Sequence, residues 1–218
     1  MEDRNLQLDR LVFFSDAVVA IAITLLALDL RLPRPAPAHL HLADVLAQWR
    51  TFAAFLLSFL NIAQFWKTHH NFFAHIRRID ERLLWLNIGW LLFIILLPFT
   101  TTLVSAYFFD CPAIALYCAN TLLIAVFQNA IWDYVATRPD FLHPGSLSRL
   151  GNFRFRIYCN LEMVNAGVAS LVALFSPAVA FVLLFAKIPM MVSVWLFFFK
   201  RRARGKMWRP GIKENAAQ

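Results

Sequence analysis

Six long apolar segments dominate this sequence and restrict the folds open to it. Each is close to the roughly 20 residues that a helix needs to cross the hydrocarbon core of a bilayer. Backbone polar groups find no water in lipid, so a helix, which bonds them internally, is the favoured structure. The sequence therefore predicts an all-α membrane protein with six transmembrane helices per subunit, at residues 11–30, 45–66, 83–108, 112–136, 157–175 and 178–199.

Composition and charge agree with a membrane protein rather than a soluble one. Apolar residues make up 60% of the chain and charged residues only 16%. The formal charge of +8 would suit a nucleic-acid partner, but the basic residues lie in short segments between the apolar ones. We therefore expect one six-helix domain over residues 1–218 in the cell membrane (plasma or inner), multi-pass, with the lipid bilayer as a partner and no nucleic acid or soluble substrate.

The distribution of lysine and arginine predicts the orientation of the chain. Alternate connecting segments carry nearly all of these residues, and the positive-inside rule places such segments in the cytoplasm. The segments on the opposite side hold only Arg31, Arg34 and Arg50. Both termini are therefore expected to be cytoplasmic, and so are the segments 1–10, 67–82, 137–156 and the basic tail 200–218.

Asp16 is the most informative charge inside an apolar segment, because a charge at bilayer depth costs about 2.5 to 3.5 kcal/mol on insertion scales. Arg10 lies six residues earlier, too far for a close pair on one helix. We therefore expect Asp16 to bond to another helix. The alternative is that Ser15 and Asp16 cap a helix that begins there.

Four other ionisable residues lie in or beside the apolar segments. Asp29 and Asp133 are close to predicted helix ends, where water can solvate them. Glu162 and Lys187 lie deeper. Lys187 is expected to pair with a carboxylate or to extend its ammonium toward the interface.

The first apolar segment has two different faces when it is drawn as a helix with about 100° per residue. Ala17, Ile21, Thr24 and Leu28 share one stripe, with Leu25 at its edge. Asp16 points about 100° away from this stripe. One face is therefore apolar apart from a single hydroxyl, and the other carries charge and would pack on the rest of the protein. Lipid contact or ordinary core packing is the alternative explanation of the stripe.

The end of the second apolar segment contains Trp66, His69 and His70. Trp66 suits the aromatic belt at a membrane interface. Adjacent histidines point in different directions on a helix, so one is expected to bond inward to a carboxylate such as Asp16 and the other to face water. A solvated helix end is the alternative. Their spacing does not suit a transition-metal site.

Three threonines, Thr100 to Thr102, follow Pro98 in the third segment. We expect Pro98 and Pro189 to kink their helices, and the threonine hydroxyls to satisfy carbonyls that the Pro98 kink frees. The sequence has no glycine-rich phosphate loop, nucleophile elbow or paired metal-ligand motif, so we expect no enzyme. It also lacks the TVGYG motif of ordinary potassium channels.

Together these residues resemble a known family. Arg10 followed by Phe14, Ser15 and Asp16 resembles the RxxxFSD signature of the transmembrane-protein-175 potassium channel family. The second segment is similar as well, with Phe65 and Trp66 followed by His69 and His70. The resemblance implies a homotetramer in which the first helix of each subunit lines a central pore.

The resemblance also implies roles for individual residues. Ile21, five residues after Asp16, would form a hydrophobic gate, with further narrowing at Leu25 and Leu28. Thr24 would contact the permeant K⁺ and favour it; no cofactor is implied. A structural role is implied for the signature residues Arg10, Phe14, Ser15, Asp16, Trp66, His69 and His70.

The function implied by the resemblance is a potassium-permeable, weakly selective leak-type cation channel. A proton- or ion-coupled secondary transporter is the alternative. It would use Asp16, Glu162, Lys187 and a histidine as a relay.

Overall fold

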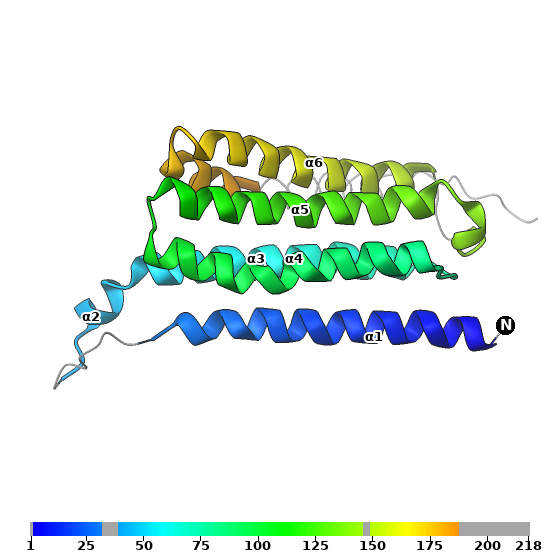
Figure 1. Ribbon diagram of the computed structural model, residues 1–218, viewed down its shortest axis with the longest axis horizontal. Helices are drawn as coiled ribbons and strands as arrows, with labels where there is room; N and C mark the ends of the chain where they lie inside the picture. The colour runs from blue at the N-terminus through cyan, green and yellow to red at the C-terminus, as the bar shows by residue number, and fades with distance from the viewer. Residues whose placement is uncertain (1, 32–38, 146–148, 188–218) are drawn as a thin grey trace, which may run out of the picture.

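The computed structural model describes residues 2–31, 39–145 and 149–187, and in this part of the chain it is a bundle of long helices (Figure 1). No strand occurs among these residues, apart from one isolated antiparallel bridge between Ile76 and Leu142. The all-α class is therefore confirmed. The long helices are α1 Glu2–Leu25, α3 Trp49–Phe73, α4 Glu81–Ala106, α5 Cys111–Ala136 and α6 Arg149–Ala173.

Shorter helices connect or extend the long ones. A 3₁₀ turn, η1 Leu26–Asp29, continues α1, and α2 Leu42–Leu46 precedes α3. Another 3₁₀ turn, η2 Pro139–Phe141, follows α5. An apolar helix, Pro177–Lys187, comes after α6.

Three of the six predicted spans are long and apolar enough to cross a membrane, namely Leu6–Asp29, Glu81–Ala106 and Cys111–Ala136. α3 and α6 overlap the predictions 45–66 and 157–175, but they are less apolar because they include polar residues such as Asn61 and Glu162. Of the last predicted span, Pro177–Lys187 is helical. The remainder of that span, with Pro189 and the tail 200–218, lies outside the described residues.

The first helix begins at Glu2, nine residues before the predicted start of the span. Residues 2–10, which are mostly polar, continue the helix beyond the apolar segment, because they include good helix formers such as leucine, glutamine and arginine. Ser15 and Asp16 therefore lie in the middle of a continuous helix. The alternative in which they cap its start is wrong.

The long helices lie side by side with α1 at one edge (Figure 1). α1 packs on α3 and α4, and α5 lies between α4 and α6. Buried leucine, isoleucine and aromatic side chains fill the space between these helices; the largest include Trp90, Trp132 and Tyr117. The free end of α1 therefore shares one end of the bundle with the start of α4 and the end of α5.

α4 remains helical through Pro98, and the threonines after it do not bond as predicted. Thr101 Oγ1 donates to the Leu97 carbonyl at 2.7 Å. Thr102 Oγ1 lies 3.1 Å from the Pro98 carbonyl oxygen. The carbonyl that loses its partner through Pro98 is that of Ile94, four residues earlier. The threonine side chains lie one turn too late to reach it, so this prediction is wrong.

Candidate functional site

The two faces of α1 have opposite surroundings in the subunit. One face is buried against α3 and α4 and consists of Leu8, Leu11, Ser15, Val19, Ala22 and Leu26. The stripe described from the sequence is exposed along its whole length: Ile21 and Leu28 are each 60% exposed and Leu25 is 41% exposed. Ala17 and Thr24 are exposed as well. A single subunit therefore leaves an apolar helix face uncovered.

A chain of buried hydrogen bonds fixes the packed face of α1. Asn87 of α4 donates from Nδ2 to Ser15 Oγ at 2.8 Å, and its Oδ1 accepts from His69 Nε2 at 2.7 Å. Ser15 Oγ in turn donates to the Leu11 carbonyl. The His69 ring stacks on Trp90, with 4.3 Å between ring centroids. Three helices thus meet through one serine, one asparagine and one histidine, all of them buried.

A second hydrogen bond, from Trp66 of α3 to Asp16, also holds α1 against the rest of the subunit. Trp66 Nε1 donates to Asp16 Oδ1 at 2.8 Å. His70 is exposed, with its ring centroid 5.4 Å from that of Trp66. The inward histidine, His69, therefore bonds to an amide rather than to a carboxylate such as Asp16, contrary to the expectation. Asp16 accepts its hydrogen bond from the indole of Trp66 instead.

Asn87 is the residue that the sequence reasoning missed. It interrupts the apolar run LLWLNIGW near the start of α4, and a lone amide inside such a run was the available signal. An amide is the group best suited to this place, because it donates to Ser15 through its nitrogen and accepts from His69 through its oxygen.

The remaining signature residues, Arg10 and Phe14, are exposed near the N-terminal half of α1. Arg10 forms no ion pair with Asp16. This agrees with their separation of six residues, which is too long for a close pair on one helix. Within one subunit the signature therefore divides into residues that hold α1 in place (Ser15, Asp16) and residues that face outward (Arg10, Phe14).

The hydroxyl of Thr24 is oriented by the backbone. Its Oγ1 donates to the Ile21 carbonyl at 2.8 Å, so its hydrogen points along the helix. The lone pairs of the oxygen stay available on the exposed stripe. At the far end of α1, Thr102 of α4 donates to the carboxylate of Asp29, which ties η1 to α4.

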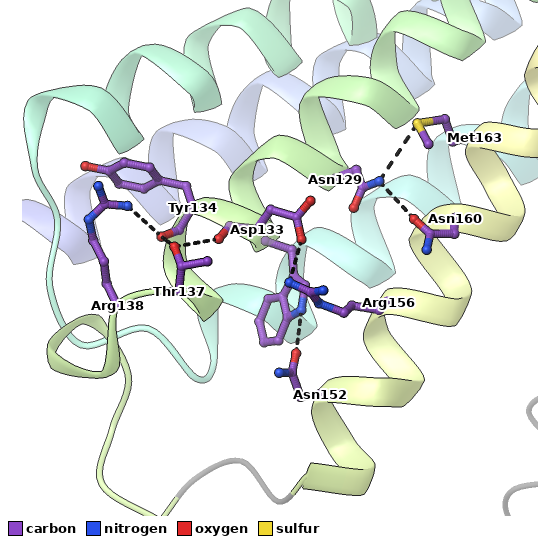
Figure 2. A network of polar contacts seen from close by, with 10 residues as sticks. Asn129, Asp133, Tyr134, Thr137, Arg138, Asn152, Arg156, Asn160 and Met163 are labelled. Atoms are coloured by element: carbon purple, nitrogen blue, oxygen red, sulfur yellow. Dashed lines mark hydrogen bonds and ion pairs between the residues drawn. The ribbon is translucent and has the colours of Figure 1, made fainter.

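The other ionisable residues in or beside the apolar segments have different environments. Asp133 of α5 pairs with Arg156 of α6 at 3.0 Å on the surface (Figure 2). Glu162 is only 2% exposed, and neither of its carboxylate oxygens has a hydrogen-bond partner among the described residues. Lys187 is 3% exposed, and its ammonium lies 4.6 Å from the centre of the Phe65 ring. The described residues contain no group of three or more histidine, cysteine, aspartate or glutamate side chains suited to a metal ion.

A family model matches the part of the chain that contains this site. The model described as the endosomal/lysosomal potassium channel TMEM175 matches residues 10–98. A potassium channel of Chamaesiphon minutus is 33% identical over 133 residues, which cover 59% of this chain and 66% of the relative. A potassium channel of Streptomyces collinus is 36% identical over 102 residues, which cover 45% of this chain and 50% of the relative. The match thus spans between half and two thirds of these relatives.

Solved structures extend the similarity over most of the chain. The crystal structure of a lysosomal potassium-selective channel TMEM175 homolog from Chamaesiphon minutus has a TM-score of 0.68 and 25% identity, and covers 87% of this chain and 97% of that one. A crystal structure of a variant of the potassium channel MtTMEM175, in complex with a nanobody–MBP fusion protein, has a TM-score of 0.57 and 19% identity, over 88% of this chain and 93% of that one, and supports the fold alone. The chain belongs to the TMEM175 potassium channel family.

Proposed function

We propose that this chain forms a potassium-permeable, weakly selective leak-type cation channel, as a homotetramer with α1 of each subunit lining the pore. The observation that carries the proposal is the exposed stripe of Ile21, Thr24, Leu25 and Leu28 on a helix whose opposite face is buried. One helix cannot enclose a pore, so copies must assemble. The names of the relatives favour potassium as the permeant ion.

In such an assembly Ile21 forms an apolar ring. An ion that crosses the ring must keep or exchange part of its hydration shell, and a narrow apolar ring can lose its water and close. Leu25 and Leu28, one and two turns further along, extend the apolar wall. The ring is therefore proposed as a hydrophobic gate.

Thr24 supplies the polar group in this wall. Since its hydrogen is directed to the Ile21 carbonyl, its oxygen presents lone pairs that replace water around a cation. Four hydroxyls provide fewer ligands than a filter built from backbone carbonyls. We therefore propose a modest preference for K⁺ over Na⁺.

The rotation of α1 about its own axis decides whether the stripe faces the pore. The bonds from Ser15 to Asn87 and from Asp16 to Trp66 lie on neighbouring sides of the helix and both involve other helices. A rotation of one residue, about 100°, would break both. These contacts are proposed to hold the stripe toward the symmetry axis.

Cysteine cross-linking separates a pore-facing stripe from a lipid-facing one. In the proposed tetramer, Ile21→Cys side chains from different subunits meet at the axis, so mild oxidation should produce disulfide-linked dimers on a non-reducing gel. Leu92→Cys is the matched control, because Leu92 of α4 is also an exposed aliphatic residue, 52% exposed. Equal cross-linking of both variants, or none in the Ile21 variant, would contradict a pore-facing α1.

A second candidate function, ion-coupled transport, rests on one observation. Glu162 is buried, its two oxygens have no hydrogen-bond partner within the part of the chain that the structure describes, and the buried Lys187 acts on it electrostatically. Such groups mark proton or ion relays in transporters. Under this alternative, Glu162→Gln abolishes saturable, coupled transport in liposomes and Ile21→Ala has little effect. Under the channel proposal, the Ile21 variant has the larger effect on passive flux.

A further inference from the structure

Two arginines at the end of the bundle that holds the start of α4 and the end of α5 share one tyrosine ring. Arg138, two residues after α5, has its guanidinium carbon 3.9 Å from the ring centroid of Tyr134. Arg82, in the first turn of α4, has its guanidinium carbon 5.1 Å from the same centroid. Figure 2 shows Arg138 beside Tyr134. Two positive groups thus lie against the same aromatic side chain.

Internal bonds of the subunit hold this arrangement. The Tyr134 hydroxyl donates to Asp80 Oδ2, and Asp80 Oδ1 accepts from the Leu83 backbone N–H at 2.8 Å. Arg138 Nη1 donates to the Tyr134 carbonyl at 3.1 Å. The ring is therefore fixed between α4 and α5, and both oxygens of Asp80 are occupied by neutral donors.

The carboxylates at this end that form ion pairs do so with other arginines. Asp140 pairs with Arg78 at 3.4 Å, and Asp133 pairs with Arg156 at 3.0 Å. Within the described residues, neither Arg82 nor Arg138 has a carboxylate within ion-pair distance. Among the described residues, the bond from Arg138 Nη1 to the Tyr134 carbonyl is the one side-chain hydrogen bond of the two arginines, so most of their N–H donors have no partner there.

Helix stability does not explain Arg82 either. A cation in the first turn of a helix is unfavourable, because the N-terminus already carries a partial positive charge from the helix dipole. An anion bound at this place would gain from that dipole and from both guanidinium groups. Arginine suits phosphate better than lysine does, since its planar N–H pairs match phosphate oxygens.

We propose that Arg82 and Arg138, stacked on Tyr134, form a binding site for a phosphate group carried by an anionic lipid of the adjacent leaflet. The site lies at the ends of two helices that are long and apolar enough to cross a membrane, Glu81–Ala106 and Cys111–Ala136. The ends of such helices lie at the depth of phospholipid headgroups. This end also carries most of the arginines, so the positive-inside rule assigns it to the cytoplasmic leaflet. Phosphate chemistry is shared by lipid headgroups and free phosphate, and the experiment distinguishes the two.

The test measures lipid retention by the full-length protein in a neutral detergent with native mass spectrometry. The probes are dioleoyl phosphatidylglycerol, dioleoyl phosphatidylcholine with identical acyl chains, and inorganic phosphate. We expect the wild type to retain phosphatidylglycerol at least fivefold better than phosphatidylcholine. The double variant Arg82→Gln/Arg138→Gln should lose this preference.

Arg31→Gln/Arg50→Gln is the matched control. It removes the same charge from the opposite end of the bundle, where the Arg50 guanidinium also stacks on an aromatic ring, that of Trp49, at 5.7 Å. Retention within twofold of wild type in this control supports the proposal. An equal loss of phosphatidylglycerol retention in both double variants would show that total charge alone determines retention, and would overturn the proposal.

Three further outcomes are decisive. Absence of any preference for phosphatidylglycerol in the wild type overturns the proposal without any variant. Binding of inorganic phosphate with the same dependence on Arg82 and Arg138, and no lipid preference, overturns the assignment to lipid. If the glutamine variants do not elute as folded protein, the double variant Arg82→Lys/Arg138→Lys replaces them, because it keeps the charge. A partial loss of lipid preference in this variant supports recognition of phosphate by the planar guanidinium groups, and full retention of the preference contradicts it.

Discussion

The indole of Trp66 on α3 donates a hydrogen bond of 2.8 Å to the carboxylate of Asp16 on α1. One turn further along α3, His69 reaches the same helix through Asn87 and Ser15. Two consecutive turns of α3 thus hold α1 at fixed rotation. This fixed rotation leaves Ile21 and Thr24 on the uncovered face, on which the channel proposal depends.

Ile21→Ala should increase passive potassium flux, because a smaller side chain widens the apolar ring and lowers the dewetting barrier. Potassium efflux from potassium-loaded liposomes measures the effect, and we expect a several-fold rise in its rate. Leu92→Ala, which truncates an exposed leucine of α4, should leave the flux unchanged. An assembled Ile21 variant with wild-type flux would remove Ile21 from the gate.

Thr24→Val should reduce the preference for potassium over sodium, since it replaces the hydroxyl by a methyl group of similar size. Reversal potentials in bi-ionic conditions measure the preference. Thr137→Val is the control, because Thr137 is exposed at the end of α5 and its hydroxyl also donates to a backbone carbonyl. Identical reversal potentials for wild type and the Thr24 variant would exclude a role of the hydroxyl in selectivity.

Asp16→Ala and Trp66→Phe should each lower the fraction of assembled protein on size-exclusion chromatography, because each removes one partner of the bond that orients α1. The double variant should be little worse than either single one, since both changes remove the same interaction. Strictly additive losses would show that the two residues act independently.

Asn87→Leu should destabilise the subunit by about 1 to 3 kcal/mol, because it leaves buried polar groups of Ser15 and His69 without their partner. Thermal denaturation in detergent measures the change. Asn129→Leu is the control. It removes a side-chain hydrogen bond of 3.1 Å from Asn129 to the exposed Asn160 (Figure 2), and it should destabilise the subunit clearly less than Asn87→Leu. The reverse order of stabilities would contradict the network.

Gly89→Ala should destabilise the protein by about 1 to 3 kcal/mol, the usual cost of overpacking. A methyl group at Gly89 of α4 would overlap with the ring of Phe127 on α5. Gly167→Ala is the matched control, since a methyl group on this helical glycine of α6 meets nothing within 4 Å. That change should be neutral or stabilising, by up to about 1 kcal/mol, because alanine favours the helix. Equal melting temperatures of the Gly89→Ala and Gly167→Ala variants would show that α4 and α5 are less closely packed at Gly89.

Much of the fold was predictable because periodicity and length depend on local sequence. The segments 83–108 and 112–136 differ from α4 and α5 by at most two residues at either end. The start of the helix around Asp16 was harder to predict, since residues 2–10, which are mostly polar, extend it beyond the apolar segment. The stripe of Ile21 and Thr24 was visible on a helical wheel, and its role in a pore stays a prediction.

The sequence by itself determined the all-helical class, the positions of the apolar helices and which residues of α1 share a face, because each of these follows from the chemistry of neighbouring residues along one helix. Only the tertiary structure decided that Trp66 rather than a histidine bonds to Asp16, and that His69 bonds to Asn87. Such pairings depend on how separate helices are rotated and placed against one another. That arrangement is set by the packing of all the buried side chains together, which local sequence does not specify.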